Sequence, residues 1–289
     1  MTRIHHERCE VDIVEHCNLS CRACSHLSPV MPRFEVKPDD LHRDLSRLWD
    51  HYESNWVALL GGEPLLHRDL VGVIDAVHEA APGAKVSVVT NGTLLPKASP
   101  GFWEAIDGVQ VCLYPGKELD RDELRHCRAQ AREHGVPMVV TRIKTFRESY
   151  SELGTEDAAL VRELFDGCLL KTGHSIAGGA FYKCPPSYFL PKAIDGVEDE
   201  GVPLDAVDLG ERLRSYLAVA EPLSACSNCL GSAGRRFSQA QTGRAEFRGL
   251  QRRPTEDLLD RRLLRAPSRT RQRLKRFSPW YYRHERRLM

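Results

Sequence analysis

Three cysteines stand close together near the start of the chain, within the segment EHCNLSCRACSHLSP (residues 15–29). Cys17, Cys21 and Cys24 have the spacing C-x3-C-x2-C. Thiolates bind iron and zinc well, and three of them on one tight loop can hold three corners of an iron–sulfur cube, which leaves the fourth iron open to a small molecule. Structural zinc sites are closed by four ligands, and His26 could supply the fourth, so a zinc site is the alternative for this loop.

Four further cysteines form a second candidate metal site: Cys168, Cys184, Cys226 and Cys229. The last two belong to CSNC, and the segment GGAFYK before Cys184 is typical of a hairpin arm with glycine at its tight turn. Four thiolates can saturate a [4Fe–4S] cluster or close a structural zinc site, and this spacing suits both. The chain has 10 cysteines and no signal-peptide-like stretch at its start, so we expect a cytoplasmic protein with metal or redox chemistry rather than disulfides.

Apolar, β-branched segments alternate with helical patterns over the first half of the chain. Strands are predicted at residues 9–17, 55–64, 84–93, 108–116 and 136–146, and helices at residues 38–52, 68–82 and 119–135. This alternation predicts an α/β fold, a partial (β/α) barrel of about five to six parallel strands. The cysteine loop and the segments GGEP and TNGT all follow predicted strands, and functional loops gather at the carboxyl ends of strands in such folds.

Composition divides the chain into a core at residues 1–150, a small cysteine-rich auxiliary domain at 151–235 and an arginine-rich extension at 236–289. From Arg235 to the last residue there are 17 Lys or Arg and 5 Asp or Glu, whereas the rest of the chain is net acidic. We expect a helical extension that packs on the acidic body. The alternatives are capture of an anionic substrate, of nucleic acid or of a membrane surface. No apolar run is long enough to span a membrane.

Three segments together resemble the radical S-adenosylmethionine (SAM) superfamily: the cysteine loop after the first strand, GGEP after the second and TNGT after the third. The resemblance implies that Cys17, Cys21 and Cys24 hold a [4Fe–4S] cluster whose open iron binds SAM. It further implies that the following residues lie at the cofactor: Gly61, Gly62, Glu63, Pro64 and Asn91.

The second cysteine group is similar to the "twitch" auxiliary-cluster domain, a shortened relative of the SPASM domain. This resemblance implies a second [4Fe–4S] cluster held by Cys168, Cys184, Cys226 and Cys229. The layout is similar to that of butirosin-pathway 2-deoxy-scyllo-inosamine dehydrogenases. The phrase CRACSHLSP looks more like radical SAM enzymes of polysaccharide and aminoglycoside pathways. Both comparisons imply a carbohydrate-like substrate and a place in antibiotic or polysaccharide biosynthesis.

One position inside the predicted barrel is informative. In VQVCLYP, Gln110, Cys112 and Tyr114 alternate with apolar residues, so they are predicted to face the barrel interior. Related enzymes often have a serine that contacts SAM at the place of Cys112, so its thiol could contact SAM or donate a hydrogen atom. Arg142 and Lys144, at the end of the fifth strand, are predicted to meet the SAM carboxylate or a substrate oxygen. Further candidate bases or substrate contacts are Glu15, His16, His174, Tyr182 and Tyr188.

The function that this resemblance implies is a radical SAM oxidoreductase. It would oxidise a carbinol of a sugar, aminocyclitol or aminoglycoside to a ketone, with the auxiliary cluster as electron acceptor and an external flavodoxin- or ferredoxin-type donor. One alternative is an epimerase in which Cys112 donates the hydrogen atom. Others are a peptide-modifying enzyme, disfavoured because no leader-binding domain is recognisable before residue 9, and a zinc-dependent nucleic-acid-binding protein. Nucleic acid is not expected as a partner.

Overall fold

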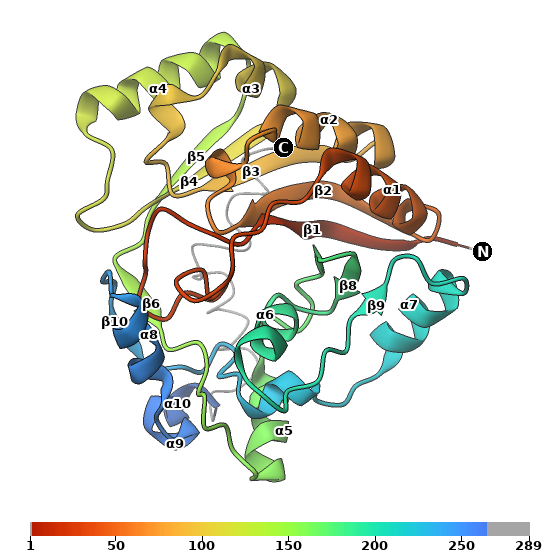
Figure 1. The fold of residues 1–289 in the computed structure, drawn as a ribbon, viewed down its shortest axis with the longest axis vertical. Coiled ribbons are helices and arrows are strands. Elements are labelled where there is room, and N and C mark those ends of the chain that lie inside the picture. The colour runs from red at the N-terminus through yellow and green to blue at the C-terminus, as the bar shows by residue number, and fades with distance from the viewer. Residues whose placement is uncertain (1, 265–289) are drawn as a thin grey trace.

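A computed structural model describes residues 2–264 and contains one large mixed sheet (Figure 1). Its strand order is β5-β4-β3-β2-β1-β7-β8-β9, and neighbouring strands from β5 to β7 run parallel. The first five strands are β1 (Ile4–Val14), β2 (Tyr52–Gly61), β3 (Lys85–Thr90), β4 (Gly108–Leu113) and β5 (Met138–Arg142). The predicted α/β class with a mostly parallel sheet is confirmed.

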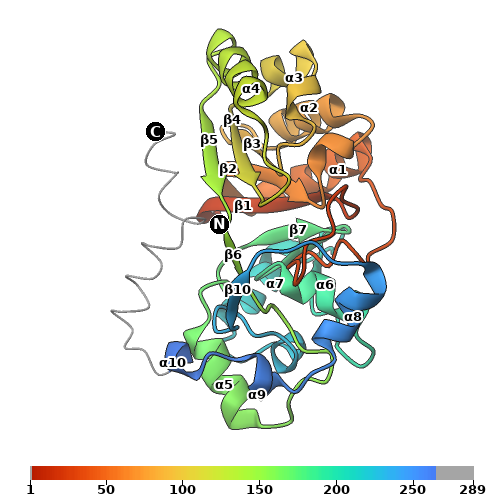
Figure 2. The ribbon, with the colours of Figure 1, turned by 90° about the vertical axis from the view of Figure 1, so that its left-hand side faces the viewer.

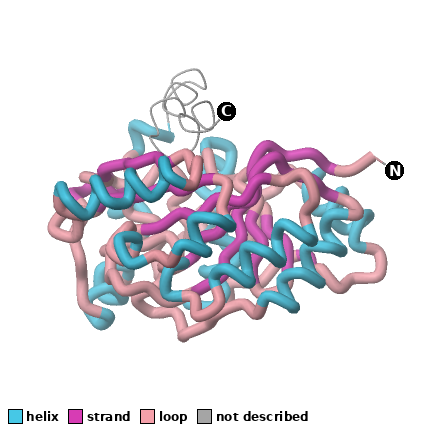
Figure 3. Tube along the Cα trace, turned by 90° about the horizontal axis from the view of Figure 1, so that it is seen from above, coloured by secondary structure: helices cyan, strands magenta, loops and turns pink. Residues whose placement is uncertain are grey.

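Helices cover one face of this sheet, as Figure 3 shows from above. They are α1 (Pro38–Trp49), α2 (Leu70–Ala80), α3 (Pro100–Ala105) and α4 (Arg121–Glu133). Each predicted helix is present, because apolar residues recur at helical spacing. Asp69 caps the N-terminus of α2, α4 begins with a capping box between Asp120 and Glu123, and α1 has no side-chain cap. The short α3 was not predicted, and it begins where Ser99 caps Phe102.

Side chains alternate across the strands and separate an apolar core from a polar interior. On β4, Val109, Val111 and Leu113 pack with the helices, whereas Cys112 faces the opposite side with Val89. On β1, Val11 and its apolar neighbours also join the helix-facing core. The predicted direction of the Cys112 side chain therefore agrees with the structure.

The segment after β5 forms a second lobe below the first (Figure 2). It contains α5 (Ala158–Gly167), β7 (Ser175–Ala177), β8 (Ala180–Tyr182), α6 (Pro186–Ala193), β9 (Val202–Pro203), α7 (Leu209–Ala218) and the short helix η3 (Ser224–Ser227). The predicted hairpin is β7–β8, and Gly178 and Gly179 form its turn with positive φ angles of 56° and 78°. Strand β7 pairs parallel with β1, so this hairpin extends the main sheet.

The first part of the C-terminal extension lies across both lobes. Strand β10 (Arg236–Ser238) pairs antiparallel with β6 (Thr145–Arg147), and α8 (Arg244–Gln251), α9 (Thr255–Leu258) and α10 (Arg261–Leu264) follow. Leu258, Leu264 and Leu160 of α5 belong to one buried apolar cluster, so the extension up to residue 264 is folded onto the body. The aromatic and arginine-rich residues from 265 onward lie outside the described part. Within residues 2–264, no helix is both long and apolar enough to cross a membrane.

Candidate active site

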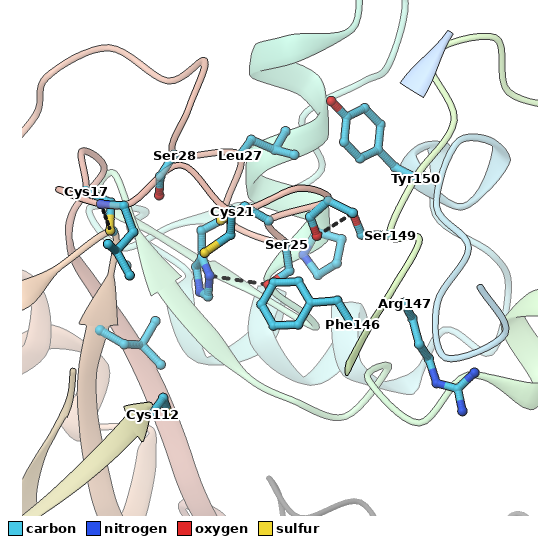
Figure 4. Close-up of a pocket in the computed structure, with 18 of the residues that line it drawn as sticks. Cys17, Cys21, Ser25, Leu27, Ser28, Cys112, Phe146, Arg147, Ser149 and Tyr150 are labelled. Atoms are coloured by element: carbon cyan, nitrogen blue, oxygen red, sulfur yellow. Dashed lines mark hydrogen bonds between the residues drawn. The ribbon is translucent and has the colours of Figure 1, made fainter. Parts of the chain in front are cut away.

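The loop after β1 carries the first cysteine group to the carboxyl ends of the parallel strands. Cys17, Cys21 and Cys24 all line a cavity of about 300 Å³, which is also bordered by the ends of β2, β3 and β4. Figure 4 shows Cys17 and Cys21 on this loop, with Cys112 at the end of β4. The sequence-predicted grouping of the three thiols at the strand ends is thus present.

The two glycines of GGEP allow the end of β2 to touch the start of the cysteine loop. A Cβ at Gly61 would overlap the carbonyl oxygen of Val14, and a Cβ at Gly62 would overlap that of His16. Gly61 also has a φ of 125°, which L-residues rarely adopt. Gly62 N–H donates to the Val14 carbonyl at 2.6 Å, so the backbones are in direct contact where the loop leaves the strand.

The Glu63 carboxylate ties neighbouring strand ends together. It is fully buried and accepts hydrogen bonds from Thr90 Oγ1 at 2.6 Å, from Asn91 N–H at 2.8 Å and from Leu65 N–H at 3.1 Å. Burial raises the pKa of Glu63 to about 7. The side chain does not line the cavity, and Pro64 beside it begins the short helix η1 (Pro64–Leu66). Any cofactor contact of this segment would therefore come from the backbone at Gly61 and Gly62.

Asn91 connects the TNGT loop to the cysteine loop. Its Nδ2 donates to Asn18 Oδ1 at 2.8 Å and lies 3.7 Å from Cys17 Sγ, and its Oδ1 accepts from Thr93 N–H at 3.0 Å. Asn91 also lines the cavity. These bonds hold the amide beside a thiol, and its place at a cofactor stays a prediction.

The donors around the first cysteine group suit a metal-bound thiolate set. Leu19 N–H donates to Cys17 Sγ at 3.4 Å, and the amides of Gln239 and Gln241 donate to Cys21 Sγ at 3.3 and 3.4 Å. Burial raises the pKa of Cys17 to about 12 and that of Cys21 to about 11, so the thiols need a cationic partner to ionise. Three thiols with N–H donors beside an open cavity fit an iron–sulfur cluster with one free coordination position.

The second cysteine group also converges. Cys168, Cys184, Cys226 and Cys229 line one small cavity of about 30 Å³ between α5, α6 and η3. Leu170 N–H donates to Cys168 Sγ and Gly231 N–H donates to Cys229 Sγ, both at 3.3 Å. Burial raises the pKa of Cys184 to about 12, and the nearby Cys168 thiol is the second largest cause of this rise. The four thiols are thus mutual neighbours.

Among residues 2–264, no three His, Cys, Asp or Glu side chains are arranged to hold a single metal ion. His26, the fourth ligand of the zinc alternative, has its Nε2 3.7 Å from Asp12 Oδ1. Burial lowers the pKa of this imidazole to about 4, so it is neutral at pH 7.

The larger cavity reaches both cysteine groups. Cys229 of the second group and the nearby Gly231 border the same cavity as Cys17, Cys21 and Cys24. A molecule in this cavity would therefore lie between the two thiol sets.

Cys112 lines this cavity and is 1% exposed. Burial raises its pKa to about 12, and the nearby Glu63 acts in the same direction. The thiol is therefore protonated at neutral pH, which is the form that can give a hydrogen atom.

Arg142 and Lys144 are not brought to the cavity. Both side chains are exposed, and Ile143 between them packs beside Cys112 on the inner side. Arg142 is the last residue of β5 and Lys144 lies just beyond it, and both side chains are directed to solvent. Arg147 lines the cavity instead, and its guanidinium donates to the Gly234 carbonyl at 3.0 Å.

The remaining predicted contacts lie outside the cavity lining: Glu15, His16, His174, Tyr182 and Tyr188. Tyr188 donates its hydroxyl to Glu15, and His174 Nδ1 lies 3.0 Å from the Tyr52 hydroxyl. Tyr182 donates to Asp199 at 3.2 Å. These hydrogen bonds place the residues in the framework around the site.

Glu148 is a cavity residue that sequence reasoning missed. It is 4% exposed and lines the cavity, and its Oε1 is bound by the Arg22 guanidinium. Its Oε2 has no hydrogen-bond partner among the described residues. Glu148 follows β6, a strand of three residues, which is too short to show a periodic pattern. The local sequence therefore does not predict that Glu148 lines the cavity.

Residues 11–153 match the family model of the Radical SAM superfamily. This match, over just under half of the chain, supports membership of that superfamily for residues 11–153. Membership implies the use of SAM and a [4Fe–4S] cluster, which the first cysteine group and its cavity fit.

Among curated proteins, the chain is similar to a GTP 3',8-cyclase of Stenotrophomonas maltophilia, with 34% identity over 44% of this chain and 40% of that protein. A probable GTP 3',8-cyclase of Methanocella arvoryzae is 30% identical over 42% of this chain and 38% of its own length. The chain thus spans about two-fifths of the length of these relatives.

Among solved structures, the chain resembles BtrN in complex with AdoMet and 2-DOIA. The TM-score is 0.51 at 18% identity, and the match covers 81% of this chain and 96% of BtrN. At this identity the likeness concerns the fold, and it extends over both lobes.

Proposed function

We propose that this enzyme oxidises a carbinol of a sugar, aminocyclitol or aminoglycoside to a ketone. The observation that carries this proposal is the single cavity bordered by all three cysteines of the first group and by Cys229 of the second. We assign Cys17, Cys21 and Cys24 to the SAM cluster, and Cys168, Cys184, Cys226 and Cys229 to an auxiliary [4Fe–4S] cluster. A substrate between two clusters can lose a hydrogen atom on one side and an electron on the other.

SAM and a [4Fe–4S] cluster held by Cys17, Cys21 and Cys24 would supply the chemistry that removes the hydrogen atom from the carbinol carbon. The tasks of the chain are to orient that carbon and to exclude water. Apolar side chains that can exclude water line the cavity, among them Leu60, Val89, Phe146 and Leu190. The electron for SAM cleavage would come from an external flavodoxin- or ferredoxin-type protein, as in a cytoplasmic setting.

Oxidation to a ketone also requires a proton acceptor, and Glu148 is the candidate. Glu148 borders the cavity, its Oε2 is buried without a hydrogen-bond partner among the described residues, and Arg22 holds the other oxygen. The balance would then be complete: the C–H hydrogen atom would leave as part of the product 5'-deoxyadenosine, Glu148 would take the hydroxyl proton, and an oxidised auxiliary cluster held by the second cysteine group would take the remaining electron. General bases of this kind typically contribute about 10²–10⁴ in rate.

The fold likeness to BtrN supports a small substrate rich in hydroxyl or amino groups, because that structure holds 2-DOIA with AdoMet. This support is an analogy of fold, which sets an expectation about the substrate but not its identity.

An epimerase is the first competing reaction, and Cys112 favours it. Its buried, protonated thiol borders the cavity, so it could return a hydrogen atom to a substrate radical. In D2O the thiol carries deuterium, so an epimerase would leave deuterium at an inverted carbon, whereas a dehydrogenase would produce a carbonyl.

The curated relatives favour a second candidate, cyclisation of GTP. The argument for it is 34% identity to a GTP 3',8-cyclase, and the argument against it is that the match spans 44% of this chain.

Anaerobic reconstitution distinguishes these reactions. The holoprotein would be incubated in D2O with SAM, dithionite and, in separate reactions, 2-deoxy-scyllo-inosamine, 2-deoxystreptamine, neamine or GTP. Mass spectrometry would then detect 5'-deoxyadenosine and the product. A ketone from a cyclitol or aminoglycoside supports the proposal, and turnover of GTP alone overturns it. Substrate-dependent 5'-deoxyadenosine that persists when Cys17, Cys21 and Cys24 are all alanine would refute the cluster assignment.

A further inference from the structure

Two glutamine side chains from the C-terminal extension contact a cysteine of the first group. Gln239 Nε2 donates to Cys21 Sγ at 3.3 Å and Gln241 Nε2 donates to the same sulfur at 3.4 Å. More than two hundred residues separate them from Cys21 along the chain. Their spacing of two places both side chains on the same side of an extended segment.

The segment that carries these amides, residues 236–242, is here called the strap. Its β10 part is paired with β6, and the next residues follow the cysteine loop (Figure 1). Arg22 N–H donates to the Ala240 carbonyl at 2.9 Å, and Thr242 N–H donates to the Ser20 carbonyl at 2.7 Å. Ser20 N–H donates to Gln241 Oε1 at 2.7 Å. The Gln241 side-chain amide therefore accepts from the backbone of the cysteine loop through its oxygen and donates to Cys21 Sγ through its nitrogen. The strap is thus bound to both sides of Cys21.

The cysteine loop has a conformation that needs external support. Ala23 has a φ of 53°, in the left-handed region, which is unfavourable for a residue with a Cβ. Ser149 donates to the Ala23 carbonyl at 3.3 Å, and the Arg22 guanidinium lies 4.2 Å from the centre of the Phe237 ring of the strap. The strap and the residues after β6 therefore clamp the loop around its middle cysteine.

We propose that the strap is a working part of the SAM-cluster site and that Gln239 and Gln241 raise the reduction potential of this cluster through Cys21. Reduction adds negative charge to the cluster and its sulfurs. An N–H donor stabilises a thiolate more strongly as that charge grows, so hydrogen bonds to sulfur favour the reduced state. Both glutamines are positioning residues, because they act through Cys21 and do not line the cavity.

This inference rests on the cluster at Cys17, Cys21 and Cys24, and it is independent of the reaction. It holds for a dehydrogenase, an epimerase or a cyclase alike. Its test needs no substrate, so its failure is distinguishable from failure of the proposed function.

The test is an anaerobic redox titration of the reconstituted holoprotein, followed by electron paramagnetic resonance. The variant Gln239→Leu/Gln241→Leu removes both donors at similar side-chain size. We expect the midpoint potential of the SAM cluster to fall while iron and sulfide contents stay at wild-type levels. Gln130→Leu on α4, far from the strap along the sheet, is the matched control and should leave the midpoint unchanged.

Each single variant, Gln239→Leu or Gln241→Leu, should give part of the shift because each removes one donor. If the double variant fails to retain its cluster, the single variants carry the test. Wild-type midpoints in cluster-loaded single or double variants would overturn the proposal. An equal fall in the Gln130→Leu control would overturn it as well.

Discussion

Replacement of Glu63 by Gln tests how the strand ends around the site are held together. Burial raises the pKa of Glu63 from 4.5 to about 7. The folded chain therefore holds a proton that the unfolded chain has released between these two pH values, and stability falls as pH rises through this window. The 2.5-unit difference corresponds to about 3 kcal/mol, of which about 2–3 kcal/mol falls between pH 5 and pH 8.

The measurement is urea unfolding of the anaerobic holoprotein at pH 5 and at pH 8, with Glu63→Gln run in parallel. The variant has no titratable group at this position. The unfolding free energy of wild type minus that of the variant should therefore fall by about 2–3 kcal/mol between the two pH values. The subtraction removes every other titrating group. Parallel pH profiles for the two proteins would show that the Glu63 carboxyl is not held in a desolvated site, and this view of the strand ends would be refuted.

Three further variants test individual residues of the site. Gly62→Ala should lose cluster loading and SAM cleavage, because its Cβ would overlap the His16 carbonyl oxygen, whereas Gly101→Ala, where a Cβ meets no atom closer than 3.9 Å, should retain both. Cys112→Ala should abolish deuterium incorporation from D2O if the reaction is an epimerisation and should spare ketone formation if it is an oxidation. Glu148→Gln should lower ketone formation by about 10²-fold with SAM cleavage retained, measured as product per 5'-deoxyadenosine; unchanged coupling would remove Glu148 as the proton acceptor.

The elements of the core could be predicted because their signals are local. Apolar periodicity gave the parallel strands and their helices, and alternation along β4 gave the inward direction of Cys112. Arg142 and Lys144, in contrast, are exposed, and Ile143 between them lies on the inner side. Charge and position at the end of a strand do not by themselves determine on which side of the sheet a cation lies.

The rest of the site depends on contacts between distant parts of the chain. Glu148 is placed by the pairing of β6 with β10. Gln239 contacts Cys21, from which it is 218 residues away along the chain. Neither contact has a sequence signature, because a polar residue in a short irregular segment looks the same whether it faces water or a cluster. The second cysteine group was predictable as a set, but its opening to the shared cavity through Cys229 was not.

The pairing of β7 with β1 has a consequence for how the protein can be divided. Glu10 and Val11 of β1 lie opposite Ser175 and Ile176, so the first strand is an interior strand only while the later hairpin is present. A fragment that ends at residue 150 would present this row of backbone amides and carbonyls as a bare, apolar-flanked edge, which invites aggregation. Residues 1–150 and the later hairpin therefore form one folding unit, and separate expression of residues 1–150 is expected to yield insoluble protein.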